Sequence, residues 1–317
     1  MRVKILLLAL LLVLLTAIGV FQLWTPNPEP SPVPLPPVRA ARVDAFEGDV
    51  RAKPRGQVAW FQVRAGQWLS NGDMLMTGPR GSAHLVFVDT ATLDVRPDSL
   101  LAIESASQDR QREALGVQSG GVQYAGPGRE VWTPTGRWFP KPGAAPVLVI
   151  RVGKDGATEI RQTAGAGTVR TAAGQTVPLQ EGTGLDVDAT GRTPGLRTLL
   201  PAPQLLAPPD HAEVTFVDPT RATTVLLWRE VAGAATYHLV LDETGFFLQP
   251  RVDRSAIPGT SVEVEGLPVG TYFWTVSAIG PDGKEGQPSA SFRFLVRSHR
   301  SGSRPASAPS KSRSADP

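Results

Sequence analysis

Residues 65–103, AGQWLSNGDMLMTGPRGSAHLVFVDTATLDVRPDSLLAI, decide the fold of this chain. Apolar and polar residues alternate along residues 82–87 and again along residues 92–96, which is the period of half-buried β-strands. Glycines stand in the breaks, where a positive backbone φ costs least: Gly66, Gly72, Gly78 and Gly81. The stretch therefore predicts short β-strands joined by tight turns, and it contains no recognisable catalytic motif.

The composition extends this expectation to the whole chain. The 317 residues include 32 glycines and 30 prolines, which favours an all-β protein with many turns and proline-rich spacers. There is no cysteine, which excludes disulfides, a thiolate zinc site, a cysteine nucleophile and a lipoprotein anchor. The length allows two ordinary domains with extensions.

The net charge is unevenly distributed. The whole chain carries +3, of which the first residues contribute +2 and residues 297–317 contribute +4, so the part between them carries −3. A slightly acidic body with basic ends argues against a nucleic-acid-binding domain, because such a domain presents a basic face. We therefore expect no nucleic-acid partner.

The chain begins with a basic start and an apolar run. Residues 5–24, ILLLALLLVLLTAIGVFQLW, match a bilayer core in length, and Arg2 and Lys4 orient the start inward. We expect an N-terminal membrane helix that serves as a signal anchor over residues 1–24. A cleaved signal peptide is the alternative, because Ala17 and Gly19 are small residues at peptidase spacing. The main part of the protein is then exported in either case.

A proline-rich stalk is expected over residues 25–40, because nearly alternate prolines favour the polyproline II conformation. At about 3.1 Å per residue, the proline-rich run of about fourteen residues at positions 25–38 would span roughly 40 Å. It would hold a folded domain clear of the membrane surface.

Residues 41–190, expected to form the first β domain, carry closely spaced strand patterns. They also contain a short sequence pattern that occurs twice, which we call the echo. LSNGDML at residues 69–75 recurs as LQEGTGL at residues 179–185, which a duplicated β unit or chance would explain. The order of landmarks at the front resembles a FecR-like domain. These landmarks are Gly48 to Val50, Gly66 to Asp73, Thr77, Ser82 to Asp89, and Ser99 with Leu101 and Ile103.

The FecR-like resemblance implies a bacterial envelope protein. Some members of that family sense an outer-membrane receptor from the inner membrane and control a sigma factor. That role requires a cytoplasmic domain, and only residues 1–4 precede the apolar run. The resemblance therefore implies a periplasmic interaction or sensing module without its own cytoplasmic output.

After residue 187 the strand pattern lapses, and residues 191–202 are expected to form an interdomain linker. Residues 203–297 then contain five clear strands and at least one more near residues 246–252. Their layout resembles a fibronectin type III-like β-sandwich, with Trp228 and Tyr237 in the core and Tyr272 at the corner. Residues 298–317 form a basic low-complexity tail that we expect to be disordered.

Few residues suggest chemistry. The four histidines lack metal-ligand spacing, and no serine nucleophile motif is present. Two carboxylates at a suitable gap could hydrolyse a glycoside, but turn roles are the simpler interpretation of Asp49, Asp73, Asp89 and Asp94. We therefore expect no cofactor and no metal.

The best candidate for partner binding is a predicted loop over residues 132–142 that carries Trp132, Trp138 and Phe139. Exposed aromatics can stack on sugars or anchor a protein partner, although the loop could also fold back onto its domain. We expect a non-enzymatic protein tethered to the bacterial inner membrane that presents two β modules to a periplasmic partner. The alternatives are a binder of peptidoglycan or another glycan and, less favoured, a hydrolase. A cleaved leader would make it periplasmic or secreted.

Overall fold

The computed structural model describes residues 39–105 and 113–299. This part of the chain is all-β, as predicted, apart from one 3-10 turn, η1 (Pro219–Arg221). Within it, no helix has the length and apolar character needed to cross a bilayer. The expected membrane segment, residues 25–38 of the expected stalk and residues 300–317 of the expected tail lie outside the described residues. Arg39 and Ala40, assigned to the stalk, instead begin the first strand.

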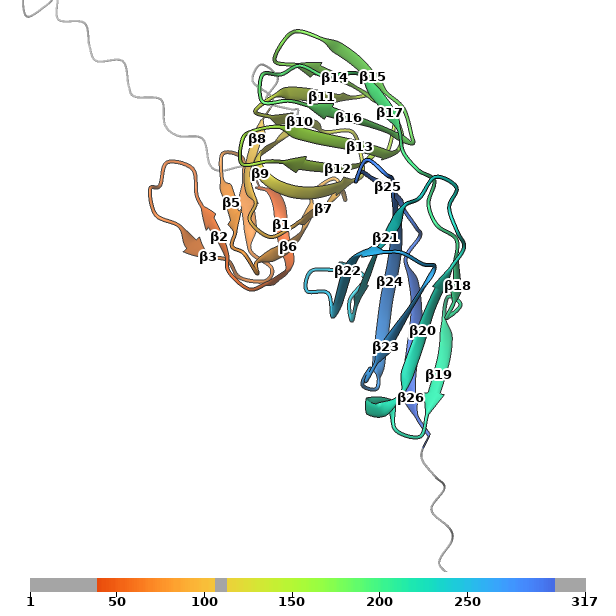
Figure 1. The fold of residues 1–317 in the computed structure, drawn as a ribbon. Helices are drawn as coiled ribbons and strands as arrows, with labels where there is room; N and C mark the ends of the chain where they lie inside the picture. Colours follow the sequence, from red (N-terminus) through yellow and green to blue (C-terminus); the bar gives the residue numbers. More distant parts are fainter. Residues whose placement is uncertain (1–38, 106–112, 300–317) are drawn as a thin grey trace, which may run out of the picture. The chain divides into compact units, whose positions relative to one another are not determined.

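The first domain consists of β1–β17 (Figure 1). Its first part contains β1 (Arg39–Glu47), β2 (Val50–Lys53), β3 (Phe61–Gln62), β4 (Trp68–Ser70), β5 (Met74–Thr77), β6 (Ser82–Phe87), β7 (Thr92–Val95), β8 (Leu100–Ser105) and β9 (Glu113–Ala125). Its second part contains β10 (Glu130–Thr133), β11 (Gly136–Pro140), β12 (Val147–Val152), β13 (Thr158–Ala164), β14 (Gly167–Thr171), β15 (Thr176–Leu179), β16 (Thr183–Val187) and β17 (Leu196–Thr198).

These strands form two sheets that share β9. The first sheet has the order β4-β1-β6-β7-β9-β12-β13-β16-β17. The second has the order β3-β2-β5-β8-β9-β10-β11-β14-β15. Residues 113–119 of β9 pair with β8 in the second sheet, whereas residues 120–125 pair with β12 in the first. One long strand thus belongs to both layers.

Gly120 marks the point where β9 changes sheets. Its φ is +87°, and a Cβ there would lie 2.3 Å from the Ser99 hydroxyl oxygen, so a larger residue does not fit. That hydroxyl is buried and accepts the Gly121 N–H at 3.0 Å. Ser99, a landmark of the FecR-like resemblance, therefore has a structural role in fixing the crossover.

The internal echo corresponds to two equivalent turns. Gly72, between β4 and β5, and Gly182, between β15 and β16, have φ of +96° and +74°. Each turn crosses from one sheet to the other, and its flanking leucines, such as Leu69 and Leu185, are almost completely buried. Asp73 fixes the first turn, because its carboxylate accepts the Ser70 N–H at 2.8 Å. The repeated pattern thus encodes a repeated sheet-to-sheet corner.

The second domain follows at β18. It contains β18 (Leu205–Ala207), β19 (Ala212–Phe216), β20 (Thr223–Trp228), β21 (Thr236–Asp242), β22 (Val252–Ile257), β23 (Ser261–Glu265), β24 (Gly270–Ile279), β25 (Glu285–Pro288) and β26 (Phe292–Ser298). One sheet has the order β18-β20-β23 and the other the order β19-β26-β24-β21-β22, with β25 paired to β24. This is the strand arrangement of a fibronectin type III-like sandwich.

The core residues expected in this sandwich are in place. Trp228 and Tyr237 are buried and meet edge to face with ring centroids 5.5 Å apart. The Tyr272 hydroxyl donates a hydrogen bond to the Pro268 carbonyl at 3.0 Å, which is the predicted corner contact. Each domain has its own hydrophobic core.

Residues 191–202, expected to form the interdomain linker, contain one short strand. This strand, β17, pairs with β16, extending the first sheet, and Leu199 is 3% exposed. The strand expected near residues 246–252 begins at Val252 instead. Apolar and polar residues alternate along a strand only where one of its faces is buried. Because β17 is a short strand at the edge of the sheet, its sequence shows no such alternation.

Candidate functional site: the charged junction between the two β domains

The outer face of the first sheet carries a row of charged side chains. Arg151 on β12, Glu159 and Arg161 on β13 and Asp186 on β16 alternate with buried residues and point away from the core. Arg197 on the edge strand β17 lies on the same face, because it pairs with Gly184 of β16 and contacts Glu159 and Asp186. Strand alternation therefore gathers five charges from four neighbouring strands on one face. We call this row, together with the residues of the second domain that meet it, the junction.

Like charges face each other within this row. Glu159 lies directly opposite Asp186 in the pairing of β13 with β16, which is unfavourable by itself. Arg197 resolves the conflict, since its guanidinium lies 2.6 Å from a Glu159 oxygen and 3.5 Å from an Asp186 oxygen. Lys284 of the second domain adds a contact of 2.9 Å to Asp186.

The most buried contact of the junction joins Arg161 to Glu285 on β25. The Arg161 side chain is 4% exposed, and one of its nitrogens lies 3.0 Å from the Glu285 carboxylate. Another donates to the Gly286 carbonyl at 3.0 Å. Arg151 also contacts Glu285 at 3.0 Å. Burying a guanidinium is costly, so these contacts are what make its position in the junction tolerable.

His238 on β21 extends the network into the second domain. Its two ring nitrogens lie 2.7 Å from Asp253 and 3.0 Å from Glu285. The hydrogen bond to Asp253, followed by that to Glu285, raises the pKa of His238 to about 9. Burial raises the pKa of Glu285, but the hydrogen bond from His238 and the charges of Arg161 and Arg151 outweigh it and hold that pKa below its ordinary value. At neutral pH the contact of His238 with Glu285 is therefore an ion pair.

Backbone contacts complete this side of the junction. The Gln287 N–H donates to the Leu200 carbonyl at 2.9 Å, which ties β25 to the segment that leaves the first domain. Gly286 lies so close that a Cβ on it would be 2.7 Å from the Leu200 carbonyl oxygen. Glycine is required there because the two backbones approach directly.

A second group of contacts lies on β6. The His84 ring stacks on Phe246 of the second domain with centroids 4.0 Å apart, and its Nδ1 lies 2.6 Å from Asp94. The Ser82 hydroxyl donates to the Leu248 carbonyl at 2.6 Å. Both polar residues face away from the core of the first domain, yet His84 is only 6% and Ser82 only 3% exposed. The second domain accounts for this burial.

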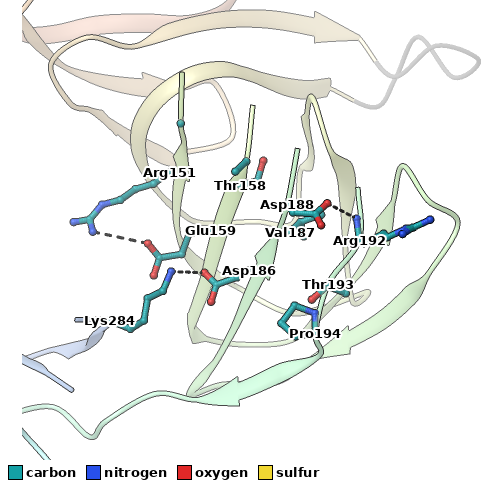
Figure 2. Close-up of a pocket in the computed structure, with 12 residues that line it drawn as sticks. Arg151, Thr158, Glu159, Asp186, Val187, Asp188, Arg192, Thr193, Pro194 and Lys284 are labelled. Carbon is teal, nitrogen blue, oxygen red and sulfur yellow. Dashed lines mark hydrogen bonds and ion pairs between the residues drawn. The ribbon is translucent and has the colours of Figure 1, made fainter. Parts of the chain in front are cut away.

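A groove of about 590 Å³ borders the junction. Figure 2 shows Arg151, Glu159, Asp186 and Lys284 on one side of it and Asp188 with Arg192 on the other. Its carboxylates already have partners. The Asp188 carboxylate, for instance, accepts the Thr190 hydroxyl at 2.7 Å and the Arg192 N–H at 2.9 Å, and these bonds lower its pKa. The groove is thus lined by charged side chains, most of them already held in ion pairs or hydrogen bonds. Among its described lining residues, every carboxylate has such a partner.

The aromatic residues proposed for partner binding are arranged differently from the prediction. They lie on the hairpin of β10 and β11 and not in a loop. Trp138 is 1% exposed and donates from its indole nitrogen to Gln162 at 3.1 Å, so the expectation that it is available to a partner is wrong. Trp132 is half-buried beside Gly116, and Phe139 is half-buried beneath the guanidinium of Arg170. Pairing with β14 turns Trp138 inward, which sequence spacing alone did not reveal.

The aspartates considered for hydrolysis each have a separate structural partner. Asp49 pairs with Arg51, Asp94 with His84, and Asp89 with Arg129. Asp73 accepts backbone N–H groups at the corner already described. The turn and strand-end interpretation of these residues therefore agrees with their contacts.

Sequence reasoning missed the junction. Arg161 and Glu159 flank Ile160 in a strand pattern that predicts two exposed charges. The charged residues on these strands could have indicated the junction. Recognising it required the pairing of β13 with β16, which the sequence does not show. Among residues 39–105 and 113–299, no group of three or more histidine and acidic side chains is placed to hold a metal ion.

Comparisons with known proteins assign no family to this chain. No family model and no curated protein matches this chain. Among solved structures, an Fn3-like protein from Clostridium thermocellum is 20% identical over 31% of this chain and 95% of its own, with a TM-score of 0.25. The extracellular domain of a hybrid two-component system protein from B. thetaiotaomicron is 12% identical over 70% and 37%, with a TM-score of 0.25.

A β-1,2-glucanase from Parabacteroides distasonis is 11% identical over 84% of this chain and 40% of its own, with a TM-score of 0.23. All three TM-scores are below 0.5, so we take the architecture from the strand pairing itself. By that pairing the chain is an all-β protein whose second domain is a fibronectin type III-like sandwich.

Proposed function

We propose that this chain is a non-enzymatic envelope protein that presents two β modules to a periplasmic protein partner as one connected unit. The observation that carries the proposal is the buried contact of Arg161 with Glu285, supported by the stack of His84 on Phe246. Two modules on a flexible linker would search for a partner independently, whereas joined modules present a fixed combined surface at a smaller ordering cost.

The proposal includes the tether inferred from the sequence. The apolar run at residues 5–24 would anchor the protein in the bacterial inner membrane, and the proline-rich segment would connect the modules to this anchor and set how far they can reach from it. The landmarks of the FecR-like resemblance support a role in the periplasm. Intact mass of the mature protein tests the tether, since loss of about the first twenty residues would indicate a cleaved leader instead.

Crosslinking in whole cells tests the partner. Val225 is 47% exposed on β20, on the outer face of the smaller sheet of the second domain, and is a suitable position for a photo-crosslinking residue. We expect a defined adduct with one envelope protein that weakens when Arg161→Met loosens the junction and persists with Arg254→Met, a substitution at an exposed site. An adduct that the two substitutions affect equally, or the lack of any protein adduct, would contradict the proposal.

Binding to peptidoglycan or another glycan is the alternative, carried by Phe139 beneath Arg170. A pull-down with purified peptidoglycan that Phe139→Ala abolishes would favour it over a protein partner. Retention that is absent, or unchanged by this substitution, would remove it.

A further inference from the structure

The hairpin between β2 and β3 exposes apolar side chains that neither core uses. Val58 is 93% and Phe61 is 50% exposed, and Trp60 between them is half-buried. Exposed apolar groups gathered at one tip usually mark a contact surface. The junction does not involve this hairpin, so its exposure needs a separate explanation.

The tip is held by local hydrogen bonds. The Gln57 N–H donates to the Pro54 carbonyl at 3.0 Å, and Gly56 in this turn has a φ of +78°. The Val63 N–H donates to the Val50 carbonyl at 3.0 Å and closes the base of the hairpin. The apolar side chains are thus displayed on an ordered turn.

The hairpin and the segment that follows it are cationic. Residues 50–72 include four cations, Arg51, Lys53, Arg55 and Arg64, and no carboxylate. Arg51 pairs with Asp49 just outside this range, and the Lys53 ammonium lies 5.3 Å from the centre of the Trp60 ring.

Two of these cations are available. Asp73 accepts the backbone N–H of Arg55 at 2.9 Å, which anchors the hairpin backbone. Among the described residues, no carboxylate lies within ion-pair distance of the Arg55 or Arg64 side chains. The hairpin therefore carries free positive charge beside its apolar tip.

We propose that the β2–β3 hairpin docks on the surface of an anionic phospholipid bilayer. Aromatic side chains favour the interface between headgroups and acyl chains, and lysine and arginine are attracted to anionic headgroups. An exposed apolar tip with cations on either side combines both forces.

The shape of the tip favours lipid over a protein partner. A protein interface commonly buries about 800 Å² on each partner around well-packed anchors. A narrow projecting turn suits insertion into a soft surface better than packing against a rigid one.

The chain enters the first domain beside the strand that follows this hairpin. Arg39, at the start of β1, pairs with Ser70 on β4, and its guanidinium lies 5.4 Å from the centre of the Trp68 ring. Trp68 is 37% exposed and adds an aromatic group near the point of entry. The proposal does not depend on a membrane tether, since the side chains of the hairpin would have the same affinity for lipid in a protein without a membrane anchor.

A local probe on the full chain tests the proposal, because residues 5–24 are expected to hold the protein in vesicles of any composition. The protein has no cysteine, so Val58→Cys introduces a single site for an environment-sensitive fluorophore. The matched control is Val217→Cys in the second domain, where the side chain is 82% exposed. Both are reconstituted in phosphatidylcholine vesicles with and without about a quarter of phosphatidylglycerol.

We expect a blue shift and quenching by lipid-borne quenchers at position 58 only with phosphatidylglycerol, and reversal at high salt. Arg55→Gln combined with Arg64→Gln should reduce the fraction of docked probe several-fold, whereas Arg229→Gln, at an exposed site of the second domain, should not. An unshifted probe, an equal shift at position 217, or a shift caused by a soluble acidic protein and not by vesicles would overturn the proposal.

Discussion

The guanidinium of Arg161 and the carboxylate of Glu285 lie 3.0 Å apart although they belong to different β domains. Both side chains are largely shielded from solvent, at 4% and 11% exposed. Without Glu285, Arg161 would lose its ion-pair partner, and without Arg161, Glu285 would keep only Arg151 and His238. This relationship makes the junction sensitive to substitutions that leave either hydrophobic core intact.

Removing one member of this pair should be costly. We expect Arg161→Met to lower the free energy of unfolding by about 3 kcal/mol, because Glu285 would stay buried with fewer partners. Urea denaturation measures this change, and Arg254→Met at an exposed site provides the matched control. A double-mutant cycle with Glu285→Gln should show strong coupling, and additive effects would contradict a direct pair.

The junction should weaken at high pH through His238. Its folded-state pKa of about 9 exceeds the ordinary 6.5, so its contribution is complete below pH 6.5 and is lost as pH rises through about 9. Because Asp253 is half exposed and partly screened, we expect a loss of about 1 kcal/mol over this range. NMR titration of His238 and denaturation with His238→Gln check this, and a His238 pKa near 6.5 would contradict it.

The junction should also weaken in acid through Glu285. Its folded-state pKa lies below the ordinary 4.5, so its stabilising effect is complete above pH 4.5 and is lost as pH falls below that value. Together with His238 this gives greatest stability between about pH 4.5 and 6.5 for these two groups. Glu285→Gln should flatten the acid limb of the denaturation profile more than Glu263→Gln, a substitution at an exposed site on β23.

The close approach at Gly286 predicts a steric effect. Gly286→Ala would place a Cβ 2.7 Å from the Leu200 carbonyl oxygen, and both partners are backbone. We expect a loss of about 1 to 3 kcal/mol in thermal or urea unfolding, because neither strand can move alone. Gly259→Ala, where a Cβ would meet nothing within 4 Å, should be nearly neutral. Equal effects of the two substitutions would indicate that the junction is loose.

The burial of Trp138 predicts a stability effect in place of a binding effect. Trp138→Ala should lower the free energy of unfolding by about 3 to 5 kcal/mol, since it removes a fully buried indole. Phe139→Ala on the same strand should cost less, because Phe139 is half-buried. Circular dichroism during urea unfolding separates these outcomes, and similar costs would argue against the inward position of Trp138.

The sequence alone determined the strand-and-turn character of this protein. Residues 65–103 predict alternating strands, and Gly66 and Gly72 have the positive φ that their turns require. The echo at residues 69–75 and 179–185 left a duplicated unit and chance both open, and in the structure each copy forms a sheet-to-sheet corner. The second sandwich was readable because Trp228, Tyr237 and Tyr272 occupy fixed positions in it. These features are local, so their causes lie within a few residues.

Only the tertiary structure decided which polar residues are buried and which aromatics are exposed. A period of two assigns side chains to two faces but cannot say which face a second domain covers. His84 and Arg161 are therefore buried on an outer face, while Trp138 turns into a core. Contacts such as that of Arg161 with Glu285 join residues more than a hundred positions apart, and no pattern along the chain records such a distance.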